Sequence, residues 1–185
     1  MFELSKNSKA IFLKILLITF DPPRNVGGIE GRGNNYAKYL TKMGHFIEVI
    51  SLSPEGDFSR EDLHGANLLN YPSSYRQVLS TLRQTMKEIS ENSIDSIFFL
   101  SGALTLYGLL LLLYARLKGV TTLAFYYGKD ILSTKSSLMA SIALRISPRL
   151  ASRIAVNSHY TASLLPRKYS KKIQIPRNIE SSTLK

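Results

Sequence analysis

The sequence predicts an α/β protein built around a doubly wound, parallel sheet. Short apolar runs such as "KILLITF", "FIEVISL" and "IDSIFFL" alternate with longer segments that repeat apolar residues at helical spacing. Strands separated by helices of that length pair in parallel, because each helix carries the chain back across the sheet. The first run is apolar at nearly every position, as in a strand that is buried on both faces.

The remaining elements follow in the same alternating order. Glycine or proline follows three of the helices, since a left-handed or amide-free residue cannot continue a helix. Strands are expected over 14–20, 46–52, 66–71, 94–100, 120–127, 152–157 and 171–175. Helices are expected from near Ile29 to Met43 before Gly44, from Tyr75 to Asn92, after Ala103 up to Gly119, from about Ser136 to Ile146 before Pro148, and from Ser158.

Composition indicates one domain over residues 1–185. Apolar residues make up 44% and charged residues 20%, which is ordinary for a globular protein with a core. The absence of cysteine excludes disulfides and thiolate metal sites, and fits a reducing, cytoplasmic compartment. The most apolar segment, residues 103–120, meets Arg116 before the ~20 residues that a spanning helix needs, so a helix buried on most sides is expected there.

The charge is distributed unevenly. The net charge is +11, but 11 basic and 11 acidic residues balance up to Ala115, whereas 13 basic and two acidic residues follow. The asymmetry indicates an anionic partner: a phosphorylated substrate, a membrane surface or nucleic acid. The chain has no helix-turn-helix, zinc or RNA-binding pattern, which argues against nucleic acid.

One segment of the basic region combines charge with apolar residues. Over 134–150, Lys135, Arg145 and Arg149 accompany Leu138, Met139, Ile142 and Ile146. Such a helix can lie in the headgroup region of an anionic membrane. The alternative is that its apolar face packs on the sheet and its charges are solvated.

The loop after the first strand, "DPPRNVGGIE", has the composition of a phosphate site. Pro22 and Pro23 end the strand, and Gly27 and Gly28 allow a ligand to approach the backbone amides. The next helix directs its free N–H groups to the same place. The alternative is a tight turn. Neither the dinucleotide-binding nor the Walker A pattern is present.

Four stretches in order resemble a known family. "PPRNVGGIE" followed by "KMGHFIEVISL", then "FYYGKDI", "RIAVNSHYTASLL" and "KKIQIPRNIE" resemble the N-terminal, acceptor-side domain of the retaining GT-B glycosyltransferases of the glycogen and sucrose synthase group, family 4 type. The resemblance implies a Rossmann-like half of a GT-B fold. It also implies that a C-terminal, donor-binding domain is absent from this chain, so that the 185 residues alone are expected to be inactive.

The resemblance also assigns roles to individual residues. Gly27 and Gly28 would bind the donor diphosphate, while Glu30, Arg32, Gly128 and Ser158 would border the cleft. Tyr127 stands where many members have a histidine that contacts the transferred sugar, and Asp130 would hold acceptor hydroxyls. Local alternatives remain open: Asp130 and Ser158 are also helix N-cap candidates, and Glu30 and Arg32 could be solvated.

The implied activity is hexosyl transfer from a nucleotide-diphosphate sugar, with retention, to a saccharide or lipid-linked acceptor. No metal and no further cofactor are expected, because no cluster of Asp or His has metal-ligand spacing. The implied location is cytoplasmic, peripheral on the inner face of the membrane. The alternative is a non-catalytic or regulatory binding domain of the same fold, with Tyr127 marking lost chemistry.

Overall fold

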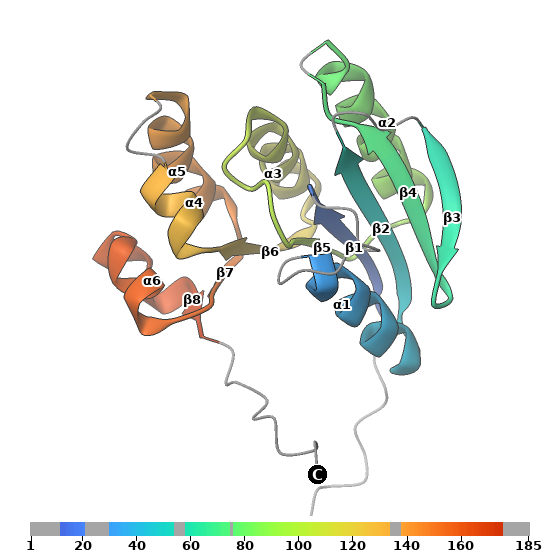
Figure 1. Ribbon diagram of the computed structural model, residues 1–185, viewed down its shortest axis with the longest axis horizontal. Helices are drawn as coiled ribbons and strands as arrows, with labels where there is room; N and C mark the ends of the chain where they lie inside the picture. The colour runs from blue at the N-terminus through green and yellow to red at the C-terminus, as the bar shows by residue number, and fades with distance from the viewer. Residues whose placement is uncertain (1–11, 21–29, 54–57, 75, 134–137, 176–185) are drawn as a thin grey trace, which may run out of the picture.

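The computed structural model describes residues 12–20, 30–53, 58–74, 76–133 and 138–175. Within them, one eight-stranded sheet has the order β3-β4-β2-β1-β5-β6-β7-β8 (Figure 1). Neighbouring strands are parallel except β3 and β4, which form an antiparallel hairpin. The strands are β1 (Lys14–Thr19), β2 (Phe46–Ser53), β3 (Ser59–Leu63), β4 (Ala66–Pro72), β5 (Ser96–Phe99), β6 (Thr121–Tyr126), β7 (Arg153–Val156) and β8 (Ile173–Gln174).

Helices join the strands and cover both faces of the sheet. In Figure 1, α2, α3 and α5 lie over one face and α1 lies over the other. The predicted α/β class with a doubly wound parallel sheet is confirmed. The helices are α1 (Glu30–Lys42), α2 (Val78–Glu91), α3 (Leu106–Lys118), α4 (Gly128–Ser133), α5 (Leu138–Leu150), α6 (His159–Leu164) and the 3₁₀ helix η2 (Arg167–Lys172).

The strands are buried because alternate side chains enter two separate core layers. Leu16 and Ile18 of β1 face the α2 and α3 side, whereas Ile15 and Leu17 face the α1 side. All four side chains are at most 2% exposed. A strand with both faces covered must be apolar at every position, which is why β1 reads as a continuous apolar run.

The chain changes direction at β1. It first builds outward through β2 and β4, and then returns to place β5 on the other side of β1. In a doubly wound sheet, such a switch point leaves a crevice at the carboxyl ends of the strands, where ligands bind. The topology therefore directs attention to the loops that follow β1, β5, β6 and β7.

Several elements differ from the sequence-based expectation, three of them clearly. The predicted strand over 171–175 is reduced to the two residues of β8, because η2 holds the chain through Lys172. Strand β3 was not predicted. Helix α5 runs past the expected end at Ile146 and through Pro148 to Leu150.

Two basic side chains explain the extension of α5. Arg116 Nη1 donates to the carbonyl of Arg149 at 2.9 Å, and Lys172 Nζ donates to the carbonyls of Pro148 and Arg149 at 3.3 Å. Cations at a helix C-terminus satisfy carbonyls without intrahelical partners and interact favourably with the helix dipole. Part of the basic excess in the last third is therefore structural.

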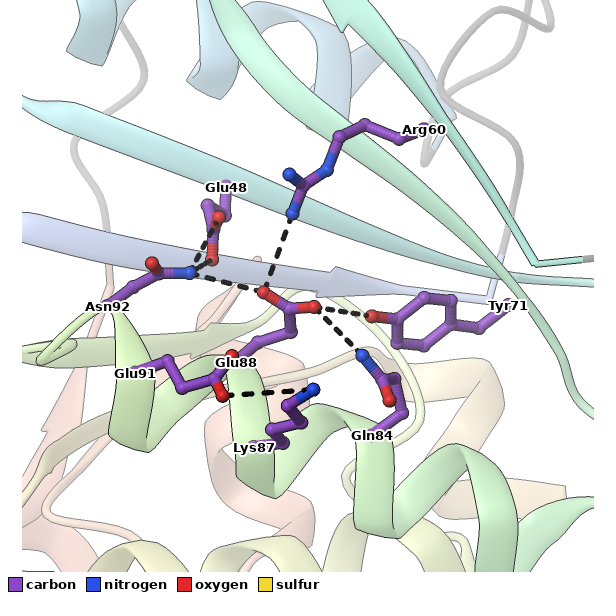
Figure 2. A network of polar contacts seen from close by, with 8 residues as sticks. All are labelled: Glu48, Arg60, Tyr71, Gln84, Lys87, Glu88, Glu91 and Asn92. Carbon is purple, nitrogen blue, oxygen red and sulfur yellow. Dashed lines mark hydrogen bonds and ion pairs between the residues drawn. The ribbon is translucent and has the colours of Figure 1, made fainter.

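A largely buried polar cluster lies between helix α2 and the strands β2 and β4 (Figure 2). Asn92 Nδ2 donates to both carboxylate oxygens of Glu48, at 3.0 and 3.1 Å, and to Glu88 at 3.2 Å. Tyr71 donates its hydroxyl to Glu88 at 3.3 Å, and Arg60 forms an ion pair with the same carboxylate at 3.5 Å. Burial raises the pKa of Glu48 above its ordinary value of 4.5. Two carboxylates are thus held near each other by shared donors.

Candidate functional site at the carboxyl edge of the sheet

The start of the candidate phosphate loop is fixed to the loop after β5. The amide of Phe20 donates to Ser101 Oγ at 2.7 Å, across the topological switch point. Gly102 has φ +77°, and a Cβ there would overlap the ring of Phe20. Only glycine fits this close approach without displacing the ring. Gly27 and Gly28 lie outside the described residues, so their diphosphate role stays a prediction.

Arg32 and Tyr127 meet at the carboxyl edge of the sheet. Arg32 lies in the first turn of α1, and Tyr127 follows β6 directly. The guanidinium carbon is 4.8 Å from the centroid of the tyrosine ring, a cation–π distance. Two residues that were predicted separately therefore form one unit. The structure does not describe the side chain of Glu30, which begins the same helix.

The hydroxyl of Tyr127 is buried and has no hydrogen-bond partner among the described residues. Its residue is 7% exposed. Burial raises the pKa of Tyr127 above its ordinary value of 10.0, and the positive charge of Arg32 opposes that shift. The group therefore remains an O–H at neutral pH and can donate a hydrogen bond to a ligand, but it is a poor base.

Gly128 and Ser158 come together where α4 and α6 begin. Ser158 is the N-cap of α6, as predicted, and its Oγ accepts from the amide of Thr161 at 3.1 Å. Thr161 Oγ1 in turn donates to Asn157 Oδ1 at 2.7 Å. A Cβ on Gly128 would be 3.4 Å from Thr161 Oγ1, an ordinary van der Waals contact, which places the start of α4 against the first turn of α6.

Asp130 occupies a different position from its predicted N-cap. It is the third residue of α4, whose first residue is Gly128. A carboxylate in the first turn interacts favourably with the positive end of a helix. Asp130 also lies close enough to Tyr127 to raise the pKa of that hydroxyl. The N-cap interpretation was wrong, and the carboxylate belongs to the same neighbourhood as Tyr127.

Sequence reasoning missed two parts of this site. The contact between Arg32 and Tyr127 joins residues far apart in the chain, and no local pattern announces it. The pair Asn157 and Thr161 does have a signal, because residues four apart at a helix N-terminus lie on one side. Buried Asn34 Oδ1, in α1, also lacks a hydrogen-bond partner among the described residues.

Within the described ranges, no group of three or more His, Cys, Asp or Glu side chains could hold a metal ion. Over the same ranges, no helix has the length and apolar character required to cross a bilayer.

Solved structures share the fold over most of this chain. A glycosyltransferase from Rickettsia africae is 18% identical, with a TM-score of 0.56 over 89% of this chain and 42% of that one. HepE from Anabaena, in complex with UDP and glucose, is 17% identical, with a TM-score of 0.55 over 88% and 44%. A putative UDP-N-acetylglucosamine 2-epimerase from Listeria monocytogenes is 10% identical, with a TM-score of 0.61 over 88% and 44%.

The chain spans less than half the length of each of these proteins. At such identities the likeness shows the fold alone, which is the Rossmann-like half of a GT-B enzyme. No curated protein matches the sequence. The family model of Glycosyltransferase Family 4, however, matches residues 26–178, and the chain therefore belongs to that family.

Proposed function

We propose that this chain is the acceptor-side domain of a retaining glycosyltransferase that moves a hexosyl group from a nucleotide-diphosphate sugar. The observation that carries the proposal is the meeting of Arg32, Tyr127 and Gly128 at the carboxyl edge, in a chain of Glycosyltransferase Family 4. Glycosyl transfer needs donors that stabilise the charge on the departing diphosphate, and this edge supplies them.

Each residue has a role in this proposal. The amides of Gly27 and Gly28 receive the diphosphate, with Arg32 adding positive charge beside them. Tyr127 donates its unused hydroxyl to the donor sugar or its phosphate. Asp130 accepts from the acceptor hydroxyls, and Ser158 borders the cleft as the N-cap of α6. No metal and no further cofactor take part in this scheme.

In the proposed reaction, the acceptor attacks the anomeric carbon from the same face that the leaving diphosphate departs. The bond between the anomeric carbon and the diphosphate oxygen breaks as the acceptor oxygen bonds to the same face. The acceptor proton passes to the departing phosphate oxygen, so no protein base is required. A tyrosine that stays protonated fits this scheme, because it serves as a donor rather than a base.

A second domain completes the donor site in this proposal. The solved structures with this fold are more than twice as long as the matched region. We therefore expect the 185 residues alone to bind a sugar nucleotide weakly and to transfer no sugar. The alternative, a non-catalytic binding domain, follows from tyrosine at position 127, where many family members have histidine.

The basic last third has a proposed partner as well. The helix α5 would lie peripherally on the inner, cytoplasmic face of an anionic membrane, near a saccharide or lipid-linked acceptor. Support comes from Arg145, Ile142 and Ile146, which are exposed on α5, with Ile142 41% and Ile146 38% exposed. The core-facing side of the same helix packs against α3.

A transfer assay tests the function. The enzyme that contains both domains is incubated with a panel of sugar nucleotides and acceptors, and the anomeric configuration of the product is read by NMR. A product that retains the donor configuration supports the proposal. Inverted product, or efficient transfer by the 185 residues alone, would contradict it.

A further inference from the structure

A groove of about 850 Å³ lies between the β3–β4 hairpin and α2, next to the polar cluster of Figure 2. Its volume is in the range of small-molecule sites. One wall is a row of α2 residues three and four positions apart, which share one side of the helix. From Ser80 to Lys87 this row rises about 10 Å along α2. The facing wall comes from Phe58, Arg60 and Tyr71 of the hairpin region.

The floor of the groove is the carboxylate of Glu88, whose acceptor positions are already filled. The residue is 8% exposed. Its Oε1 accepts from the Tyr71 hydroxyl at 3.3 Å and from Gln84 Nε2 at 3.1 Å. Its Oε2 accepts from Asn92 at 3.2 Å and pairs with Arg60 at 3.5 Å, as Figure 2 shows. Because a carboxylate offers about four acceptor positions, Glu88 has none left for a cation or hydroxyl of a ligand.

The unused polar groups around this floor are mostly cationic donors. Arg83 is exposed, and its guanidinium has no ion pair or hydrogen bond among the described residues. Lys87 pairs with Glu91 at 3.7 Å, but both side chains are more than half exposed, so the pair is weak. Arg60 directs one nitrogen at Glu88, and its side chain is 60% exposed. The groove therefore fits a ligand that brings negatively charged acceptors.

An exposed aromatic ring indicates what carries those negative charges. Phe58 is 50% exposed, and its ring is held against the Tyr71 ring, with centroids 5.1 Å apart and planes at 60°. A fixed ring of this kind offers an apolar platform to the C–H face of a sugar. Ser80 Oγ and the carbonyl oxygen of Gln84 can still accept from sugar hydroxyls. Single-stranded nucleic acid stacks on successive rings, whereas Phe58 is the one exposed aromatic among the described lining residues.

We propose that this groove binds an acidic saccharide, a chain of sugar rings that carry carboxylate or phosphate groups. One ring packs on Phe58, and the acidic groups pair with Arg83, Lys87 and Arg60. The groove is separate from the site at Tyr127, because β4 lies four strands from β6, roughly 19 Å at about 4.8 Å per strand.

The role of this saccharide as the acceptor rests on the proposed function. Strand β3 is antiparallel to β4, so Phe58, just before β3, lies toward the carboxyl end of β4. A chain held in the groove would thus have one end directed to the edge at which the sugar is transferred. The groove would retain a long acidic acceptor between rounds of transfer.

Trigalacturonate tests the binding directly, with neutral maltotriose and pentathymidylate as the comparison ligands. Calorimetry on the 185-residue protein is the measurement. We expect trigalacturonate to bind at least about tenfold more tightly than maltotriose, by an amount that falls as salt rises. Equal affinities for the two trisaccharides, or binding of neither, would overturn the proposal. Tighter binding of pentathymidylate than of trigalacturonate would mean a nucleic-acid groove and would also overturn it.

Two matched pairs of variants locate the site. Arg83→Gln should lower trigalacturonate affinity by about tenfold, whereas Arg153→Gln, at an exposed arginine outside the groove, should leave it unchanged. Phe58→Ala should also weaken binding, whereas Phe12→Ala, at a residue that is 61% exposed and does not line the groove, should not. Unchanged affinity in folded Arg83→Gln protein would overturn the assignment. A loss in Arg83→Gln but not in Phe58→Ala would mean an anion site without a sugar platform and would overturn the saccharide.

Kinetics of the proposed two-domain enzyme separate the groove from the transfer site. With a long acidic acceptor, Arg83→Gln should raise KM and leave kcat unchanged, because the groove retains the acceptor and takes no part in the reaction. An unchanged KM would remove the acceptor role. An enzyme that transfers no sugar to any acceptor would contradict the proposed function, and calorimetric binding of trigalacturonate would still establish the groove.

Discussion

The guanidinium carbon of Arg32 lies 4.8 Å from the centroid of the Tyr127 ring, which joins the first turn of α1 to the end of β6. The ring presents its face to the cation, and its hydroxyl is left without a hydrogen-bond partner among the described residues. Leaving a buried hydroxyl unpaired costs stability in the unliganded protein. A ligand that accepts this hydrogen bond would recover the cost. An unpaired buried donor is therefore expected in a binding site rather than in a purely structural contact.

Removal of this hydroxyl should lower sugar transfer while leaving the stability of the fold nearly unchanged. Tyr127→Phe should leave the free energy of unfolding within about 1 kcal/mol of the original, because no hydrogen bond within the described protein is lost. In the proposed two-domain enzyme, sugar transfer should fall by about tenfold or more, the expected loss for a hydrogen bond to a charged ligand. Urea unfolding and initial rates check the two quantities.

The control for this variant is Tyr160→Phe, on the exposed side of α6, where the residue is 62% exposed. It should change neither quantity. Unaltered transfer by Tyr127→Phe would remove Tyr127 from the site.

The glycine loop should be sensitive to side-chain size at Gly28, whereas Gly31 in α1 should not be. Gly28→Val should abolish transfer and leave the fold intact, because a β-branched side chain blocks the approach of a phosphate to the amides. Gly31→Val is the matched control, since a Cβ at Gly31 would meet nothing within 4 Å. Circular dichroism checks that both variants are folded, and rate measurements compare their sugar transfer. If Gly28→Val remains active, the loop is only a turn.

Gly102→Ala should be strongly destabilising. The residue has φ +77°, and its added Cβ would overlap the ring of Phe20, so both backbone strain and a steric clash oppose it. A loss of about 2–4 kcal/mol in the free energy of unfolding is expected. Gly119→Ala, with φ +73° but open space around its Cβ, should cost only the backbone part. Equal losses in the two variants would show that Phe20 is free to move.

These cases show why the sequence predicted some features and not others. Gly44 and Gly119 were predicted as helix stops and have φ +86° and +73°, because a helix end is determined by its own residues. Strand β3 was missed because "SREDL" is polar and pairs only with β4 at the edge. The longer α5 depends on Arg116 and Lys172 from other elements. Contacts between distant residues leave no local pattern.

The buried carboxylate of Glu48 should make stability depend on pH. Burial raises its pKa in the folded protein, so between 4.5 and that raised value the folded state binds more protons than the unfolded state. The contribution of Glu48 to stability is therefore present at low pH and is lost as the pH rises through this window. Glu48→Gln should remove this part of the decline, as measured by urea midpoints from pH 4 to pH 8.

Glu91→Gln provides the control for that titration. Glu91 lies on the same side of the molecule, in an ion pair with Lys87 at 3.7 Å, and its side chain is 58% exposed. Its replacement should leave the dependence of the urea midpoint on pH unchanged. A Glu48→Gln profile identical to that of the original protein would mean that Asn92 and Arg60 compensate for the burial.

The α3 and α5 surface should bind anionic membranes in a salt-dependent way. Exposed Ile142 and Ile146 supply apolar contact, and basic residues near a membrane surface contribute about 1 kcal/mol each. Arg145→Glu with Lys118→Glu is the variant that isolates the surface charge, because Arg149 donates to Tyr169 at 3.2 Å and its loss would also disturb the fold. Arg83→Glu with Lys87→Glu, on α2, makes the same charge change elsewhere.

Vesicle co-sedimentation should show binding to anionic lipid that fades as salt rises, that weakens in the first variant and that persists in the second. Equal binding to neutral and anionic vesicles would contradict the charge argument, and equal weakening in both variants would mean that net charge, rather than this surface, attracts the membrane.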